Sequence, residues 1–224
     1  MNPIAAMLNM FIDPAESAKA FGQKFAWIWP LLVSGAIVGA VSFMMSPIAF
    51  EVMRRNPPGN LTAEQLERSA GMMQTIGKIT AVFAPVMLGV MAVIGAALIM
   101  AACAVLDLKP KFAEVFTMLS FGSVIHALGA AAGFAVIKLK GDDLNSIADL
   151  RPALGLDIFF HEGLPKPILG TLNYFSIFNI WYIVVIALAF AALAGTSKGK
   201  AFAATAPAWM LGWFFAVIGS FFQR

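Results

Sequence analysis

Five long stretches without a charged residue constrain the fold of this chain more than any other feature of its sequence. They cover residues 25–50, 79–106, 115–137, 167–197 and 201–223. Each exceeds the ~20 residues that a helix needs to cross ~30 Å of hydrocarbon. Charged side chains are costly at mid-bilayer, and lipid offers no partner for an unpaired backbone group. We therefore predict five transmembrane helices.

The composition excludes several classes of protein. Hydrophobic residues make up 60% of the chain and charged residues 12%, compared with roughly 25% charged in an ordinary soluble domain. A soluble enzyme, a disordered tail and a disulfide scaffold are excluded, and the single cysteine, Cys103, has no partner in the chain. The net charge of +3 comes without a clustered basic face, which argues against nucleic acid as a partner. The partner that the composition indicates is the lipid bilayer.

The predicted fold class is an all-α integral membrane protein, a bundle of five transmembrane helices with an N-terminal amphipathic interfacial helix. We place an arm at residues 1–24 and a five-span domain at 25–224. Between Ala15 and Phe25, apolar residues alternate with Lys19 and Lys24 at roughly helical spacing. This favours a helix lying on the membrane surface, and a mobile tail is the alternative. The predicted spans are 26–50, 79–106, 115–137, 171–194 and 201–222.

The connections between the spans also carry local signals. Thr62 followed three residues later by Gln65 is a capping box, which predicts that a helix starts there and runs into the second span. The third connection, 138–166, mixes polar and apolar segments, which is typical of a segment resting in the membrane interface. Aromatic residues that favour the headgroup level are the expected interface anchors: Trp27, Trp29, Trp181 and Tyr182.

One ionisable residue, His126, lies in the middle of the third predicted span. Such a group is a functional candidate, and the alternative is a neutral histidine bonded to a neighbouring helix. Asn173, Ser176 and Asn179 follow one another at intervals of three residues, so they share a helix face. They form either a set of interhelical hydrogen bonds or the lining of a polar cavity. These four residues are the candidate polar site within the membrane.

Small residues recur at four-residue intervals and predict close helix packing, either within the chain or between two copies. They are Gly35, Gly39, Gly129, Gly133, Ala187, Ala191 and Gly195. Asp157, His161 and Glu162 superficially resemble metal ligands. Catalytic zinc takes three protein ligands, and the other histidine of the chain lies in a span, so we predict no metal site and no cofactor.

Three short motifs resemble the Yip-domain (Ypt-interacting protein) family, in its small bacterial-type form. The first is Met-Phe-Ile-Asp-Pro at 10–14, with Phe21 before the first span. The stronger ones are Leu-Asn-Tyr-Phe-Ser-Ile-Phe-Asn-Ile-Trp at 172–181 and Thr-Ser-Lys-Gly-Lys-Ala at 196–201. The third span departs from the family pattern, because it lacks the proline often present there. The resemblance implies a five-span helical protein with a cytoplasmic N-terminus and no known catalytic residues.

Three hypotheses for the function follow. The leading one is a non-enzymatic membrane protein that acts through partner binding or through membrane organisation and trafficking, with a membrane protein or a second copy as partner. The alternative is a permease or channel subunit for small molecules or ions that uses His126, Asn173 and Asn179. A membrane-embedded enzyme using His161 and Glu162 is the third. We predict a multi-pass membrane protein, located in the plasma (inner) membrane if the chain is bacterial. The numbers of basic residues on the two sides do not settle its orientation.

Overall fold

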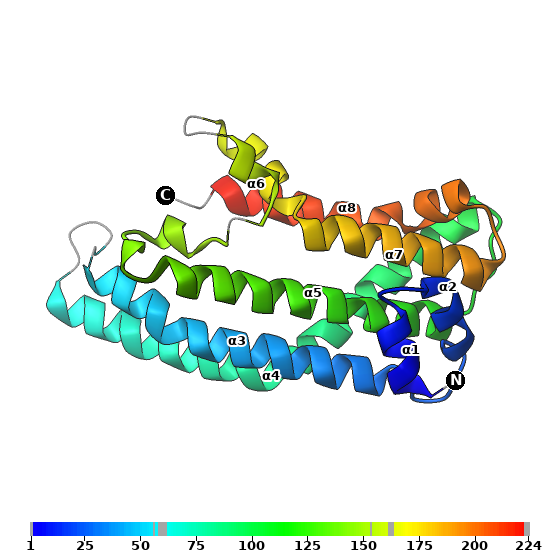
Figure 1. Cartoon of the computed structure of the whole chain (residues 1–224), viewed down its shortest axis with the longest axis horizontal. Coiled ribbons are helices and arrows are strands. Elements are labelled where there is room, and N and C mark those ends of the chain that lie inside the picture. Colours follow the sequence, from blue (N-terminus) through cyan, green and yellow to red (C-terminus); the bar gives the residue numbers. More distant parts are fainter. Residues whose placement is uncertain (1, 56, 58–61, 153, 161–163, 222–224) are drawn as a thin grey trace.

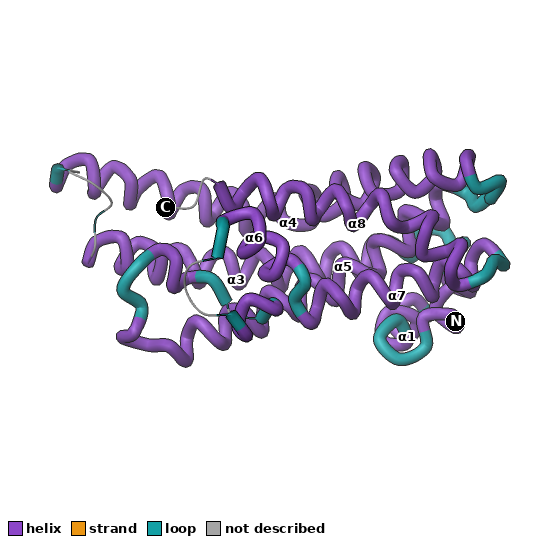
Figure 2. Tube along the Cα trace, turned by 90° about the horizontal axis from the view of Figure 1, so that it is seen from above, coloured by secondary structure: helices purple, strands orange, loops and turns teal. Residues whose placement is uncertain are grey.

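The computed structural model describes the whole chain except residues 1, 56, 58–61, 153, 161–163 and 222–224. Five of its helices are long and apolar enough to cross a membrane, which confirms the predicted fold class. They are α3 (Ile28–Arg55), α4 (Ala63–Val105), α5 (Phe112–Lys140), α7 (Ile177–Ala194) and α8 (Lys198–Phe221). They lie roughly parallel to one long axis, with the N-terminal arm at one end of the bundle (Figures 1 and 2).

The first two long helices form a close hairpin. The predicted capping box is confirmed: the Thr62 hydroxyl accepts from the Gln65 backbone N–H, and the Gln65 side chain accepts from the Thr62 N–H. The helix that starts there continues as α4 for 43 residues without a break. At 1.5 Å per residue it is about 64 Å long, twice the hydrocarbon thickness. Its first part, before Lys78, therefore extends beyond the charge-free run, beside the end of α3 (Figure 1).

The third span, α5, is the central helix of the bundle. Half of its most apolar window is buried within the protein, compared with 22% in α3 and α4. It contacts α3, α4 and α7, and its residues Val115, Met118, Phe121 and Ile125 belong to the main core cluster. Its Ser123 hydroxyl donates to the Ser34 hydroxyl on α3 at 2.9 Å. This bond links two buried hydroxyls on different spans, from residues 89 positions apart in the chain.

The N-terminal arm folds as short elements: α1 (Pro3–Asn9), α2 (Pro14–Ser17) and a 3₁₀ turn, Ala18–Ala20. Asn2 and Asp13 cap α1 and α2, because their side chains accept from backbone N–H groups of the first turn. The arm bridges two spans, since α1 contacts α3 and α2 contacts α7.

The arm differs from the single surface helix expected over 15–25. Helical geometry ends at Phe21, and Phe25 has a positive φ of 64°. Met10 and Phe21 are buried in the main core, and the Phe21 ring meets Phe121 of α5 edge-on with centroids 5.4 Å apart. The apolar face of the arm therefore packs on protein. Its opposite side exposes Ile12, which is 88% accessible.

The fourth span is interrupted. A short helix, α6 (Lys166–Tyr174), ends where the backbone bends at Phe175 and Ser176, and α7 begins at Ile177. The span predicted at 171–194 therefore begins in one helix and continues in another. The third connection, between α5 and α6, consists of 3₁₀ turns that fold back along α5: Gly141–Asp143, Ile147–Leu150 and Leu156–Phe159.

Candidate polar cavity in the membrane

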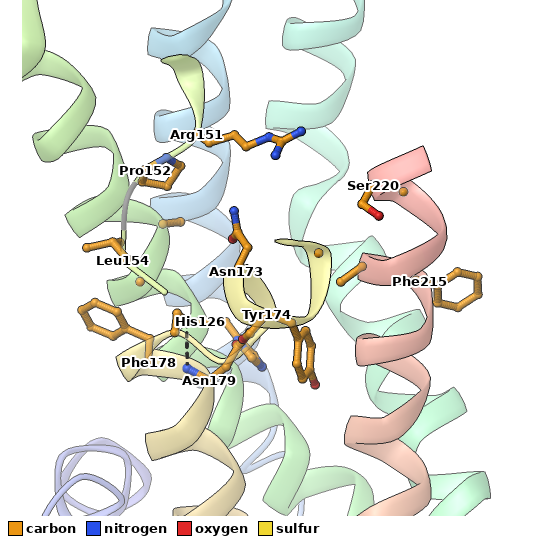
Figure 3. A pocket seen from close by; sticks show the side chains of 16 residues that line it. His126, Arg151, Pro152, Leu154, Asn173, Tyr174, Phe178, Asn179, Phe215 and Ser220 are labelled. Atoms are coloured by element: carbon orange, nitrogen blue, oxygen red, sulfur yellow. Dashed lines mark hydrogen bonds between the residues drawn. The ribbon is translucent and has the colours of Figure 1, made fainter. Parts of the chain in front are cut away.

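A cavity of about 540 Å³ lies between α5, the third connection, α6, the start of α7 and the end of α8 (Figure 3). His126, Asn173, Ser176 and Asn179 all line it. The structure therefore brings together the four polar residues that the sequence singled out, from three different helices or caps. Further polar lining comes from Arg151, Tyr174 and Ser220, and no acidic residue lines the cavity within the described part of the chain.

The cavity exists because the fourth span breaks there. Ser176 caps α7 by accepting from the Asn179 backbone N–H at 3.2 Å. Ser176 also forms an antiparallel bridge with Gly155 of the third connection, and the Ile177 N–H donates to the Leu154 carbonyl at 3.2 Å. These bonds satisfy backbone groups that the interrupted helix leaves open. Irregular backbone at membrane depth is tolerated where protein buries it or where it lines a cavity, and both conditions hold here.

The depth of this break follows from contacts along α5. Gly133 faces Pro152, whose ring would be 2.9 Å from a Cβ at that position, and Gly129 faces Phe178 in the same way. Gly133 and Gly129 lie seven and three residues beyond His126, about 10 Å and about 5 Å along the helix. His126 is at the middle of the charge-free run, so Pro152 and Phe178 both lie within the ~30 Å of hydrocarbon. The third connection is therefore re-entrant at this point.

His126 stands at the inner end of the cavity (Figure 3). The His126 side chain is exposed where it lines the cavity. The ring lies against Tyr182, with centroids 4.1 Å apart, and interacts with the Asn179 side chain. Asn179 Nδ2 donates to the Tyr174 carbonyl at 2.6 Å, so its Oδ1 is the atom left to accept from an imidazole N–H.

A second, mostly apolar cavity of about 270 Å³ lies on the other side of His126, between α4, α5 and α8. His126 and Tyr174 line both cavities and so form the wall between them. The Tyr174 hydroxyl donates to the Trp209 carbonyl of α8 at 2.6 Å. The Trp209 indole N–H, which is buried, has no hydrogen-bond partner among the described residues. The wall between the two cavities is thus polar, and the unbonded Trp209 indole N–H lies next to it.

Comparison with protein families adds the missing context. The model of the Yip1 domain matches residues 8–219, nearly the whole chain. The chain belongs to the Yip1 domain family. No curated protein and no solved structure matches it. The match confirms the family resemblance drawn from the short motifs and establishes a Yip1-domain protein that passes the membrane several times.

The small residues predicted to pack helices lie at contacts within this Yip1 domain. A Cβ on Gly35 would be 2.3 Å from Pro85, and one on Gly39 would be 2.5 Å from the Ala81 carbonyl, so α3 lies directly on α4. Ala187 is buried, and Ala191 packs at the edge of the main core. Gly195 has a different role, because it ends α7 with a φ of 58° and no atom lies within 4 Å of its Cβ position.

The predicted interface aromatics divide into exposed and packed residues. Trp29 is 52% accessible, whereas Trp27 meets Phe116 edge-on at 5.6 Å. Trp181 packs against Phe11 of the arm at 5.4 Å. Tyr182 lies against His126 and lines the second cavity, so it belongs to the wall of the polar site.

Sequence reasoning missed Arg151, Tyr174 and Trp209 as parts of this region. Arg151 stands in a polar connection, and its place at the cavity follows only from the long-range contact between Pro152 and Gly133. The sequence did contain a signal for the break in the fourth span. Serine is a preferred N-cap residue, so Ser176 could have been interpreted as the start of a new helix. His161 and Glu162 lie outside the described residues, and within the described part of the chain no group of three metal-ligating side chains occurs.

Proposed function

We propose that this Yip1-domain protein is non-enzymatic and acts in membrane trafficking, through binding to membrane partners or through organisation of the bilayer. The observation that carries the proposal is the family match over residues 8–219. We place the N-terminus in the cytoplasm, as the family resemblance implies, and assign the chain to the small bacterial-type form, with the plasma (inner) membrane as its site.

The surface of α4 supports partner binding. Several large apolar side chains on this helix are exposed, among them Met72 and Ile76 in the part beyond the charge-free run, at 66% and 55% accessible. This stretch lies beside the last turns of α3 in the first span, since the Cβ position of Gly77 is 3.0 Å from Ser46, and either lipid or another membrane protein covers it. An apolar surface there is suited to contact with another protein.

The experiment uses the full-length chain in its own membrane. A photo-cross-linking residue placed at Met72 should give a discrete adduct with a membrane protein, whereas one at Ile99, which is fully buried on the same helix, should give none. Removal of the chain from the cell should delay delivery of newly made membrane proteins in a pulse-chase assay, and the wild-type chain should restore it. Unchanged delivery together with no adduct at Met72 would contradict the proposal.

A second candidate function is a permease or channel subunit for small molecules or ions. It is favoured by one observation: His126, Asn173 and Asn179 line a single cavity at a broken span, the arrangement that marks binding sites in many transporters. Liposomes carrying the wild-type chain should then pass protons or small ions faster than protein-free liposomes, and His126→Leu should remove the difference. Equal flux with and without the chain would exclude this function.

A further inference from the structure

The inference concerns Arg151, the one cation that lines the 540 Å³ cavity among the residues described. Its side chain is partly buried, and its backbone carbonyl accepts from Lys140 Nζ at 3.3 Å. In Figure 3 the Arg151 side chain lies at the outer end of the cavity, above Asn173, with His126 at the inner end. No carboxylate within the described ranges forms a salt bridge with its guanidinium.

The position of Arg151 favours a counter-charge close to its guanidinium. Its neighbour Pro152 lies beside Gly133 of α5, about 10 Å from mid-bilayer, so Arg151 is near the border between hydrocarbon and headgroups. A guanidinium at this depth is stabilised by pairing with an anion or by reaching the headgroup region. Among the described residues the cavity lining contains no acidic side chain, so these residues do not supply the anion themselves.

The remaining polar lining offers uncommitted hydrogen-bond donors. The Asn173 side chain forms no hydrogen bond with any residue in the described part of the chain, and it lies beneath Arg151 (Figure 3). By contrast, the backbone N–H groups of Ile177 and Asn179 are already bonded, to Leu154 and to Ser176. Arg151 and Asn173 are therefore available to hold a ligand, and both can donate.

The rest of the lining determines the kind of molecule that fits. Apart from its polar groups, the cavity is bounded by apolar or small side chains such as Ala130, Leu154 and Phe178. A guanidinium matches the two oxygens of a phosphate or carboxylate in a bidentate manner. A ligand that matches both the guanidinium and the apolar lining carries one anionic group and an apolar portion.

We propose that this cavity binds an anionic amphiphile, with its phosphate or carboxylate paired to Arg151 and hydrogen-bonded by Asn173, and its apolar part directed toward Phe178. The anion comes either from the headgroup of a membrane lipid or from a small soluble ester or acid. The site goes beyond the proposed trafficking role and does not depend on it. It shares the cavity of the second candidate function but requires binding only, so it holds whether or not anything crosses the membrane.

The test measures binding to the purified full-length protein in detergent by native mass spectrometry. The probes are phosphatidylglycerol, phosphatidylcholine, and phenyl phosphate as a small soluble ester. The wild-type protein should retain phosphatidylglycerol or phenyl phosphate in preference to the zwitterionic lipid. Preference for phosphatidylglycerol identifies a lipid headgroup as the source, and preference for phenyl phosphate identifies a soluble one.

Variants locate the site. Arg151→Gln should weaken retention of the anionic probe about tenfold, the loss expected for a charge-assisted hydrogen bond, and Arg151→Lys should restore part of it. Arg68→Gln is the matched control, because Arg68 is 82% exposed and pairs with Glu64 on α4, away from the cavity. Asn173→Leu is a second, independent variant. It removes no charge and breaks no hydrogen bond of the described fold, and it should also weaken binding of the anionic probe.

Two results would overturn the proposal. One is equal retention of anionic and zwitterionic probes by the wild-type protein. The other is unchanged anion binding in both Arg151→Gln and Asn173→Leu, since adventitious binding elsewhere would then explain the signal. Neither result bears on cross-linking at Met72 or on liposome flux, so failure of this site is distinguishable from failure of the proposed functions.

Discussion

The seam between α3 and α4 and the seam between α5 and α6–α8 are both built from uncharged, mainly apolar stretches, but they pack in opposite ways. In the first, Gly35 and Gly39 bring the backbone of α3 onto Pro85 and Ala81. In the second, a bend at Ser176 and a re-entrant connection leave a cavity of about 540 Å³. Hydrophobicity therefore places both seams in the membrane without deciding whether they are dense or hollow.

The two seams differ in whether the helix backbone is continuous across the contact. Between α3 and α4 both helices are continuous across the contact, and small residues allow van der Waals packing, which drives helix association in lipid. At the fourth span the helix stops at Tyr174, and its open backbone groups must find partners in the third connection. Those partners hold the connection inside the membrane and leave polar side chains around the space.

Gly39→Leu should have the largest effect, because it would force the dense seam apart. The Cβ position at Gly39 is 2.5 Å from the Ala81 backbone oxygen, which cannot move without moving α4. We expect a loss of about 3 kcal/mol or more of unfolding free energy, measured as a lower melting temperature of the purified protein by tryptophan fluorescence. Gly71→Leu is the control on α4, because no atom lies within 4 Å of its Cβ position. Equal melting of the two variants would show that the seam is not dense.

Asn179→Leu should have the next largest effect and tests the hollow seam. It removes the hydrogen bond to the Tyr174 carbonyl at 2.6 Å and the contact with His126, which tie α7 to α6 and α5. We expect a loss of about 1–3 kcal/mol of unfolding free energy, because buried polar groups lose a partner. Ile180→Leu, at the next position of α7 and 42% exposed, is the control. If both variants melt alike, water in the cavity replaces the amide at little cost.

The same comparison explains which parts of the fold the sequence could predict. The five spans follow from charge-free runs, since exclusion of charge is a local property, and the start of α4 follows from the capping box at Thr62. The break in the fourth span was not predicted, because residues 167–197 are uncharged throughout and a hydropathy pattern continues across a helix cap. The spacing of three residues between Ser176 and Asn179 indicated a shared helix face. In the structure Ser176 is instead the N-cap of α7, and its hydroxyl accepts from the Asn179 backbone N–H.

The site shows a similar division. His126 and the asparagines stood out because polar groups are rare in apolar runs, but their shared cavity depends on how distant segments fold together. Arg151 was hidden by its polar surroundings, and its position depends on Pro152 meeting Gly133. The arm was placed on lipid because its pattern shows that one face is apolar. The pattern does not show what covers that face, and here Phe121 covers Phe21.

Tyr174→Phe sharpens the comparison at a single bond, the one from the Tyr174 hydroxyl to the Trp209 carbonyl at 2.6 Å. This bond closes the wall between the two cavities and joins α6 to α8. We expect a loss of about 0.6 kcal/mol, and at most about 1.7, the range measured for hydrogen bonds between membrane helices. Tyr182→Phe is the control, because no hydrogen bond of its hydroxyl is found within the described residues. A larger loss for Tyr182→Phe would place the polar wall on α7 instead.

The smallest expected effect is a dependence on pH at the outer end of the hollow seam. Asp149 accepts from the Ser146 hydroxyl at 2.9 Å and from the Ser146 and Asn145 backbone N–H groups at 2.7 and 3.0 Å, while the Asp149 carbonyl accepts from Lys140 Nζ at 3.0 Å. The Ser146 hydroxyl, first among these bonds, lowers the pKa of the Asp149 carboxyl below its ordinary value.

Because the folded protein holds this pKa below the unfolded one, the carboxylate contributes its full stabilisation above the ordinary aspartate pKa of about 3.9. That contribution is lost as the pH falls through the lower, folded pKa. Asp149→Asn should therefore melt below the wild-type protein at pH 7, and the difference should shrink as the pH falls below about 4. Gly39→Leu and the wild-type protein should keep their difference over the same range, because the dense seam contains no titrating group at that contact. A constant gap for Asp149→Asn at every pH would mean that the hydrogen-bond geometry of the turn stabilises the protein without the charge of Asp149.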